Sequence, residues 1–299
     1  MRKPAPLRRG DVIGVVAPAA AVDSAALAAG IHALEQLGFQ VHVGPAVFHR
    51  DGYLAGSDQE RLADLIAMFH NPEVKAIIGA RGGYGSGRLL PLLDPAVARA
   101  HPKIVVGFSD LTFVLSDLVQ RSGLVAFHGP DVVHVGRNAE AATRLAALLG
   151  GERHDWNLRA SDVIQPGTAE GRIVGGCLSV LVATLGTPYA IETDRCLLFL
   201  EDTNEKPFRI DRMLTQLRQA GKLDQVAGVV FADMHACSAG PDEAVTVRDV
   251  IAEAFAGAIY PVAFGLPSGH GTGSVTLPLG VRARLAGERL TLLESPLSE

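Results

Sequence analysis

The sequence predicts an α/β protein: an N-terminal doubly wound, mainly parallel sheet with helices on both faces, followed by a smaller mixed α+β C-terminal domain. Two observations predict this architecture. The run from Asp11 to Ala17 is almost wholly apolar, as expected of a strand that is buried on both faces of a parallel sheet. Segments of helical spacing then alternate with such runs, which is typical of successive β-α-β units.

The composition is that of a globular protein that binds a small or peptidic ligand. With 299 residues, 48% of them hydrophobic, the chain can form one large or two ordinary domains, and we expect two. The formal net charge of -5 comes with no Lys/Arg tract, which argues against nucleic-acid partners and anionic membranes. Neither a signal peptide nor a membrane span is evident. The three cysteines, Cys177, Cys196 and Cys237, suit neither a disulfide framework nor a zinc site, so we expect a cytoplasmic location.

The N-terminal domain is predicted over residues 1–152. After the first strand, Leu27, Ile31 and Leu34 share one face of a helix that ends before Gly38. The elements expected next are a strand over 40–43, a helix over 57–69, a strand over 74–79, a glycine-rich turn, a helix near Leu89, a strand over 103–107 with its helix, a strand over 124–127 and a helix that ends at 149.

Residues 153–170 lack a clear period and contain Pro166-Gly167, so we expect a linker there. The C-terminal domain is predicted over residues 171–299. Its expected elements are a helix over 178–185, a strand over 196–200 that ends at Glu201, a helix over 211–219, a strand over 226–231, a helix over 247–255, a strand over 262–265 and a hairpin over 283–293.

Ser109 stands at the turn where a β-branched strand gives way to a helix. Such a turn raises a serine hydroxyl above the carboxyl edge of the sheet, beside the amides of the next helix, as in a nucleophile elbow. The usual pattern is G-x-S-x-G, and Leu111 stands in the last position here. In the alternative interpretation, Ser109 is a helix N-cap and Asp110 lies favourably in the first turn.

Two further polar residues stand where predicted strands end, Glu201 and His270. A serine nucleophile needs a base of near-neutral pKa, and that base needs a third group that fixes its tautomer and stabilises the imidazolium. Histidine and a carboxylate are the residue types for these roles. Taken singly, Glu201 could be a solvated strand end or pair with Arg209, and His270 could be an ordinary loop residue.

A glycine-rich loop, Arg81-Gly82-Gly83-Tyr84-Gly85, follows the strand over 74–79. Glycines at the carboxyl end of a strand let backbone amides approach a ligand, so the loop could cradle a phosphate or supply an oxyanion donor. The spacing fits neither the P-loop nor the full G-x-G-x-x-G pattern, and an oxyanion loop is favoured over nucleotide binding. A plain tight turn is the remaining interpretation.

Over nearly its whole length the chain resembles the serine carboxypeptidases of the murein LD-carboxypeptidase family, the muramoyltetrapeptide carboxypeptidases. The motifs that carry the resemblance come in the family's order. They are Ala17-Pro18-Ala19, Tyr53-Leu54-Ala55-Gly56-Ser57 with Arg61, the Arg81 to Gly85 loop, Gly107-Phe108-Ser109-Asp110, His128-Gly129-Pro130, Leu185-Gly186-Thr187-Pro188, Glu201-Asp202 with Asp211-Arg212-Met213-Leu214, and Gly269-His270-Gly271.

The resemblance implies a catalytic triad of Ser109, Glu201 and His270, with Ser109 in the first domain and the other two in the second. It also implies an oxyanion hole formed by the amides of Asp110 and Gly83. No metal or other cofactor is required. Cys177 departs from the family, because members commonly carry Asn after this Gly-Gly pair.

The function implied is cleavage of the L-D peptide bond that releases the terminal D-alanine from murein tetrapeptides, in peptidoglycan recycling. Such an exopeptidase must bind a free carboxylate, for which Arg81 and Arg209 are candidates by position. The partner is then a muropeptide, with no nucleic acid or membrane involved, and a homodimer is among the expected states.

Two alternatives stay open. The chain is also similar to the microcin-immunity peptidases of the same family, which act on peptidyl-nucleotides and carry aromatic residues in an added loop. The single tryptophan here, Trp156, lies in the predicted linker. The other alternative is a non-catalytic two-domain protein whose cleft closes on a ligand.

Overall fold

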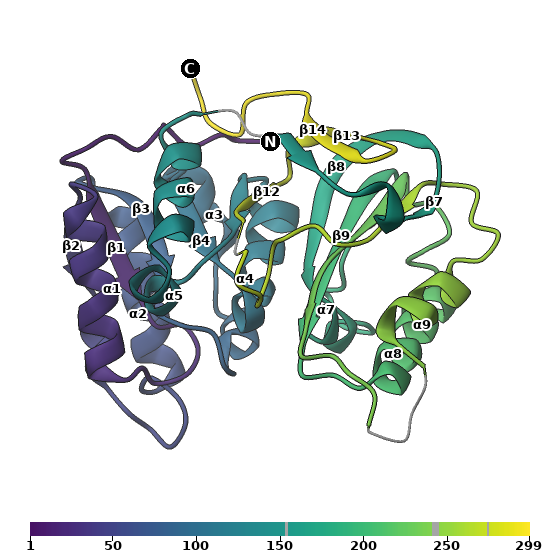
Figure 1. The fold of residues 1–299 in the computed structure, drawn as a ribbon. Helices are drawn as coiled ribbons and strands as arrows, with labels where there is room; N and C mark the ends of the chain where they lie inside the picture. The colour runs from purple at the N-terminus through teal and green to yellow at the C-terminus, as the bar shows by residue number, and fades with distance from the viewer. Residues whose placement is uncertain (153–154, 241–244, 274) are drawn as a thin grey trace. The chain divides into compact units, whose positions relative to one another are not determined.

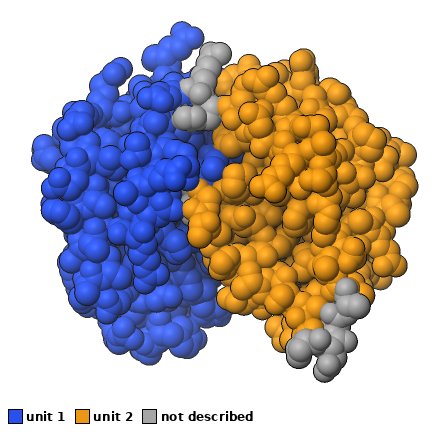
Figure 2. Space-filling view, viewed as in Figure 1, with its two compact units in different colours: residues 1–152, 275–280, 295–299 blue, residues 153–274, 281–294 orange. Residues whose placement is uncertain are grey.

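The computed structural model describes residues 1–152, 155–240, 245–273 and 275–299. The chain divides into two compact units, which Figure 2 colours separately. Unit 1 consists of Met1–Glu152, Val275–Gly280 and Ser295–Glu299, and unit 2 consists of Arg153–Ser274 and Val281–Glu294. Two late segments of the predicted C-terminal domain, 275–280 and 295–299, therefore belong to unit 1.

Six strands form the sheet of unit 1: β1 (Val12–Val16), β2 (Gln40–Val43), β3 (Val74–Gly79), β4 (Ile104–Gly107), β5 (Ala126–His128) and β12 (Leu277–Leu279). Their order across the sheet is β12-β5-β4-β3-β1-β2. The five N-terminal strands pair in parallel, and β12 pairs antiparallel to β5. The predicted fold class, a mainly parallel α/β sheet in one of two domains, is confirmed.

Six α-helices accompany this sheet: α1 (Ser24–Gln36), α2 (Asp58–His70), α3 (Pro95–Ala100), α4 (Thr112–Asp117), α5 (Val132–Arg137) and α6 (Ala139–Leu149). Helix α1 connects β1 to β2, whereas α2, α3 and α4 connect strands that advance in the opposite direction along the sheet. Because β-α-β crossovers are right-handed, α1 lies on the opposite face from α2, α3 and α4. Helices α5 and α6 pack with α1 (Figure 1), so both faces are covered.

The strand order reverses between β1 and β3. In open α/β sheets, ligands bind beyond the carboxyl ends of the strands at such a reversal. Here the loops that follow β1 and β3 touch, because a Cβ atom on Gly83 would lie 2.5 Å from the Cβ atom of Ala20. The glycine-rich loop of residues 81–85 therefore stands at the position where the topology favours a site.

Eight strands form the sheet of unit 2: β6 (Asp155–Asn157), β7 (Val163–Gln165), β8 (Thr168–Cys177), β9 (Cys196–Thr203), β10 (Gly228–His235), β11 (Val262–Ala263), β13 (Arg282–Ala286) and β14 (Arg289–Leu292). Their order is β6-β14-β13-β8-β9-β10-β11-β7. The central strands β8 to β11 run parallel, and the outer strands pair antiparallel. In the described part of this unit, three α-helices accompany them: α7 (Leu178–Ala183), α8 (Pro207–Gln219) and α9 (Val247–Ala254).

In the segment predicted as a linker, 153–170, residues 153–154 lie outside the described ranges, and residues 155–170 contribute β6, β7 and the first residues of β8 to this sheet. Strands β6 and β7 have only three residues each, and β6 alternates exposed, buried and exposed side chains. A three-residue strand has too few apolar positions to produce a recognisable period. Within the described ranges, the chain has no helix with the length and apolar character that a bilayer crossing needs.

Helices α1 and α5 approach each other through glycine. A Cβ atom on Gly30 would lie 2.1 Å from the carbonyl oxygen of Val132, and one on Gly136 would lie 2.6 Å from the amide nitrogen of Gly30. This contact fixes the start of α5, and the residue that caps α5 is Asp131.

We predict that Gly30→Ala destabilises the protein by about 1 kcal/mol or more, because overpacking typically costs about 1–3 kcal/mol. Helix propensity alone predicts the opposite, a gain of about 1 kcal/mol for Ala over Gly. Urea denaturation decides between the two effects, with Ala28→Gly on the exposed face of α1 as the variant that reports propensity alone. A higher midpoint for Gly30→Ala than for the wild type would contradict the predicted contact.

Candidate functional site

Ser109 is held in a strained conformation at the end of β4. Its φ angle is +58°, in the left-handed region, which for a residue other than glycine costs about 1–2 kcal/mol. The Leu111 side chain packs closely against the backbone of Gly79 and Gly107. Cβ atoms on these glycines would lie 2.2 and 2.4 Å from its Cδ2 atom. The leucine in place of the usual glycine of the elbow pattern thus fills the space that two glycines leave at the ends of β3 and β4.

The structure does not support the alternative in which Ser109 is a helix N-cap. Ser109 is the first residue of a short 3₁₀ turn, Ser109–Leu111, whose N-cap position is Phe108, and no side chain caps this turn. The Ser109 side chain is partly exposed, whereas Phe108 and Asp110 are buried. The turn therefore leaves the Ser109 side chain partly accessible to solvent and buries the residues on either side of it.

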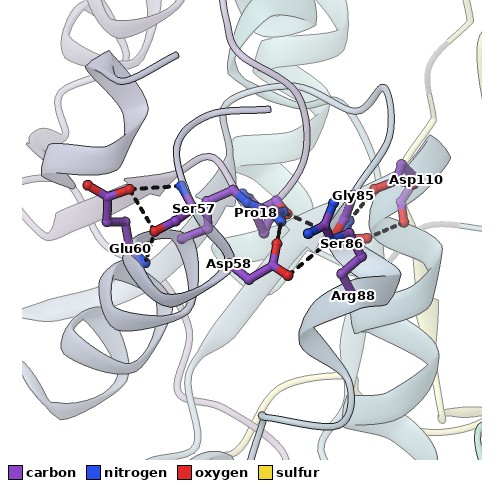
Figure 3. A network of polar contacts seen from close by, with 9 residues as sticks. Pro18, Ser57, Asp58, Glu60, Gly85, Ser86, Arg88 and Asp110 are labelled. Carbon is purple, nitrogen blue, oxygen red and sulfur yellow. Dashed lines mark hydrogen bonds and ion pairs between the residues drawn. The ribbon is translucent and has the colours of Figure 1, made fainter. Parts of the chain in front are cut away.

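Asp110 fastens the elbow to the glycine-rich loop. Its carboxylate accepts a hydrogen bond of 2.8 Å from the amide of Ser86, and its carbonyl oxygen accepts one of 2.6 Å from the Ser86 hydroxyl (Figure 3). Both residues are buried. The paired bonds set the distance between the loop after β3 and the turn after β4.

The backbone of Gly82 lies directly against the serine. A Cβ atom on Gly82 would be 2.8 Å from Ser109 Cβ and 3.0 Å from Ser109 Oγ, so a side chain there would collide with the serine. The Gly82 amide donates to the carboxylate of Asp131, at 3.2 Å, and is not available to a ligand. The amides of Gly83 and Asp110 donate to no acceptor within the described ranges.

A buried arginine, Arg61, binds the loops that follow β1 and β3. The guanidinium of Arg61 donates to the carbonyl oxygens of Pro18 and Gly85, the latter at 3.0 Å, and pairs with Asp58. Asp58 also pairs with Arg88 at 3.0 Å. Arg61 thereby connects the loops after β1 and β3 to the first turn of α2, and a planar guanidinium can hold several such acceptors at once.

In unit 2, Glu201 and His270 form a close pair. The Nδ1 atom of His270 lies 2.6 Å from Oε2 of Glu201, whose side chain is fully buried, while 14% of the His270 side chain is exposed. When Nδ1–H donates to the carboxylate, the basic lone pair of the ring is on Nε2. Arg209, the partner that the sequence offered as an alternative for Glu201, bonds Glu205 instead, at 3.4 Å.

The prediction that the strand ends at Glu201 is wrong. Strand β9 continues to Thr203, so Glu201 lies inside the sheet, opposite Cys177 of β8. The apolar run stops at Leu200, but the next residue, Asp202, is also buried and accepts hydrogen bonds from the amides of Ser179 and Thr203, both at 2.8 Å. Such satisfied polar residues extend a strand without any signal in its hydrophobic pattern.

Cys177, which departs from the family, is buried beside Glu201. Its Sγ atom lies 3.3 Å from the hydroxyl of Ser179. Burial, and then the negative charges of Glu201 and Asp202, raise the pKa of the Cys177 thiol well above its ordinary value. The side chain is therefore a neutral thiol at physiological pH.

The two arginines predicted to bind a substrate carboxylate are both exposed, and they lie in different units. Arg81 donates to the carbonyl oxygen of Ala21 at 3.3 Å. Arg209, on α8, lies 6.0 Å from the ring centre of Phe208. Arg81 is thus the first residue of the glycine-rich loop in unit 1, and Arg209 lies on α8 in unit 2.

Sequence reasoning named Arg61 only as part of a family motif, without a role, and it missed three other residues that hold the site together: Ser86, Asp131 and Asp233. Asp131 could have been found from the sequence, because it is a polar residue just after the end of β5, as Ser109 is just after the end of β4. The role of Asp233, which contacts the His270 loop, is hidden by an irregular strand. Among the described side chains, no three from His, Cys, Asp and Glu gather in a way that could hold a metal ion.

Comparison with known families matches both halves of the chain. The family described as the LD-carboxypeptidase N-terminal domain matches residues 13–129. The family described as the LD-carboxypeptidase C-terminal domain matches residues 170–285.

Three proteins illustrate the similarity. A Bacillus subtilis (strain 168) protein named "Probable murein peptide carboxypeptidase" is 40% identical over 309 residues, covering 99% of this chain and 96% of its own. The crystal structure of muramoyltetrapeptide carboxypeptidase from Oxalobacter formigenes has a TM-score of 0.83 and 29% identity, over 94% of this chain and 97% of its own.

The third is the microcin C7 self-immunity protein MccF of Escherichia coli, 27% identical over 93% of this chain and 91% of its own. The structure of MccF in the wild-type apo state covers 100% of both chains with a TM-score of 0.92. Its identity of 24% shows a shared fold alone.

The bonds between Asp110 and Ser86 lead to a prediction on stability. Asp110→Ala leaves the buried Ser86 amide without an acceptor, which costs about 1–3 kcal/mol. Asp110→Asn keeps an acceptor oxygen at the same place and should lose less than half as much. Urea denaturation of both variants measures the difference, and equal losses would show that the Ser86 amide does not depend on this side chain.

Proposed function

This chain belongs to the LD-carboxypeptidase family, and from that premise we propose that it is a serine carboxypeptidase that releases the terminal D-alanine from murein tetrapeptides by cleaving an L-D peptide bond. The observation that carries the proposal is the conformation of Ser109. A non-glycine residue in the left-handed region, placed on a turn whose neighbours are buried, is strain of the kind that functional sites retain.

In this proposal, Ser109 Oγ attacks the scissile carbonyl carbon while His270 Nε2 accepts the hydroxyl proton. Glu201 holds the ring by its Nδ1–H and stabilises the imidazolium that forms. The imidazolium then gives its proton to the leaving amine of D-alanine, and a water molecule, activated by the same histidine, hydrolyses the acyl-enzyme. The assignment requires that Ser109 of unit 1 and His270 of unit 2 act on the same bond.

The negative oxygen of the tetrahedral intermediate needs hydrogen-bond donors that are not already engaged. We assign this role to the amides of Asp110 and Gly83. The support is that the Gly82 amide is occupied by Asp131, whereas the other two donate to no acceptor in the described part of the chain.

For the substrate, we propose a muropeptide whose free carboxylate is bound by an arginine. Arg81 is favoured over Arg209 because it precedes Gly82, whose backbone lies against Ser109. We further propose that the enzyme works in the cytoplasm, as a homodimer, in peptidoglycan recycling. The peptidyl-nucleotide alternative gains no support from Trp156, because its side chain is buried on β6 opposite Leu290 and is not presented for stacking on a base.

The first test concerns the nucleophile. Ser109→Ala should lower turnover of a murein tetrapeptide by several orders of magnitude, as loss of a triad nucleophile does. Ser109→Gly should be equally inactive, yet more stable than Ser109→Ala by about 1 kcal/mol, because glycine adopts a positive φ without strain. Steady-state kinetics and urea denaturation of the same samples measure both effects, and fluorophosphonate labelling of the wild type separates an enzyme from a binding protein. Retention of more than about a tenth of the wild-type rate by Ser109→Ala would end the assignment.

The second test concerns stereochemistry. A site built around one leaving residue rejects the opposite configuration, because the methyl group meets the wall or the carboxylate leaves its donors. We expect release of D-alanine from an L-D terminal bond to be favoured at least about 100-fold over release of L-alanine, since a misplaced carboxylate costs on the order of 3 kcal/mol. Chromatography of products from matched tetrapeptides, with the D-Ala-D-Ala pentapeptide and a peptidyl-adenylate as controls, measures the ratio. Comparable release of both enantiomers would contradict the LD specificity even if Ser109 proved to be the nucleophile.

A further inference from the structure

A second carboxylate, that of Asp233, lies against the loop that carries His270. Strand β10 pairs with β9 in parallel, and the register shifts by one residue between Phe231 and Met234. Phe231 pairs with Leu200 and Met234 with Asp202, so two residues of β10, Ala232 and Asp233, face the single residue Glu201. Such a bulge re-aims a side chain, and it places Asp233 beside the triad glutamate predicted on the neighbouring strand.

Asp233 binds the His270 loop at both ends. Its amide donates to the carbonyl oxygen of Ser268 at 3.0 Å. Its carboxylate accepts a hydrogen bond from the amide of Gly271. The two bonds enclose residues 268–271, so one residue of the sheet anchors the loop at both ends of the segment that carries the histidine.

The two glycines beside His270 show how tightly this loop is held. A Cβ atom on Gly269 would lie 2.5 Å from Oε2 of Glu201, and one on Gly271 would lie 2.5 Å from Oδ2 of Asp233. Each glycine is thus pressed against one carboxylate. The Gly-His-Gly sequence is required because the loop passes between two acidic side chains that leave no room for a Cβ atom.

We propose that Asp233 is a positioning residue for His270: it fixes the loop of residues 268–271 by two hydrogen bonds, and its carboxylate provides a second negative charge that favours the imidazolium form of the histidine. This proposal rests on the proposed function, in which the imidazolium is the acid that protonates the leaving amine. The contacts themselves lie wholly within unit 2.

The electrostatic surroundings of Asp233 are consistent with this role. Burial raises the pKa of its carboxyl, and the Gly271 amide opposes that change. The charge of Glu201 on β9 raises this pKa further, whereas His235, on β10 itself, and His270 lower it. By reciprocity, an ionised Asp233 and a protonated His270 stabilise each other.

Two substitutions separate anchoring from charge. Asp233→Asn removes the charge but keeps an oxygen that can accept from Gly271, whereas Asp233→Ala removes both. Asp162→Asn is a matched control, because its carboxylate lies 3.0 Å from the Cβ position of Gly265, in the same stretch of chain that leads to His270.

The primary measurement is an NMR titration of the His270 ring in the full-length protein, with its signal assigned by comparison with His270→Gln. We expect the His270 pKa to fall by about one unit in Asp233→Asn, the loss expected when one nearby carboxylate is removed. The Asp162→Asn control should leave it unchanged. An identical His270 titration in the wild type and in Asp233→Asn would overturn the proposal, as would an equal shift in the control.

The second measurement is the pH profile of kcat/KM with a murein tetrapeptide. Because the acid limb of this profile reports the base of the free enzyme, it should move to lower pH in Asp233→Asn by the same amount as in the titration. Above that limb, Asp233→Asn should retain activity within several-fold, while Asp233→Ala should lose on the order of 10–100-fold, since a displaced catalytic group costs about this much. Equal activity of Asp233→Ala and the wild type would refute the anchoring role.

The two measurements distinguish the two proposals. An inactive wild-type protein with a normal His270 shift would count against the proposed function and in favour of the Asp233 contact. An active wild-type enzyme with no shift in Asp233→Asn would leave the function standing and remove Asp233 from it.

Discussion

The close passage of the glycine-rich loop over Ser109 is the constraint on which the rest of unit 1 depends. Gly82 leaves no space for a side chain between the loop and the serine, and Leu111 fills the space below the turn. A serine in the left-handed region persists only where its surroundings over-determine the backbone. The hydrogen bonds that the Ser86 amide donates to Asp110 and the Gly82 amide donates to Asp131 provide that determination.

Charged residues hold these loops in places where an apolar core could not. Arg61 is fully buried, and removing a guanidinium from water is costly unless its hydrogen bonds are replaced. Its acceptors are two backbone carbonyls and the carboxylate of Asp58, all at the carboxyl edge of the sheet or the start of α2. Loops carry backbone groups that need polar partners, so a buried cation that bonds several carbonyls can order a loop without a regular ladder. In unit 2 an acidic side chain orders a loop in a similar way, because the carboxylate of Asp233 accepts a hydrogen bond from the loop that carries His270.

The sequence predicts the alternation of strands and helices because continuous apolar runs and helical faces are local signals. It also places Ser109, Glu201 and His270 near strand ends, and the structure puts the last two 2.6 Å apart, while their catalytic roles stay predictions. The sequence does not reveal the contacts that hold these residues in place. Ser86 meets Asp110, and Asp233 meets Gly271, only through tertiary structure. The register of β10 shifts by one residue between Phe231 and Met234, and the apolar run that ends at Ala232 does not indicate such a shift. The three-residue strands β6 and β7 are too short for any period to emerge.

Strand β12 belongs to the sheet of unit 1 but comes late in the chain. Residues 277–279 supply the strand that covers the outer edge of β5, so that edge remains unpaired until almost the whole chain has left the ribosome. Unpaired strand edges are templates for association with other chains. A fragment that stops near residue 152 would expose this edge permanently, although the N-terminal family boundary lies well within it. The sheet of unit 1 can therefore be completed only after most of unit 2 has been synthesised.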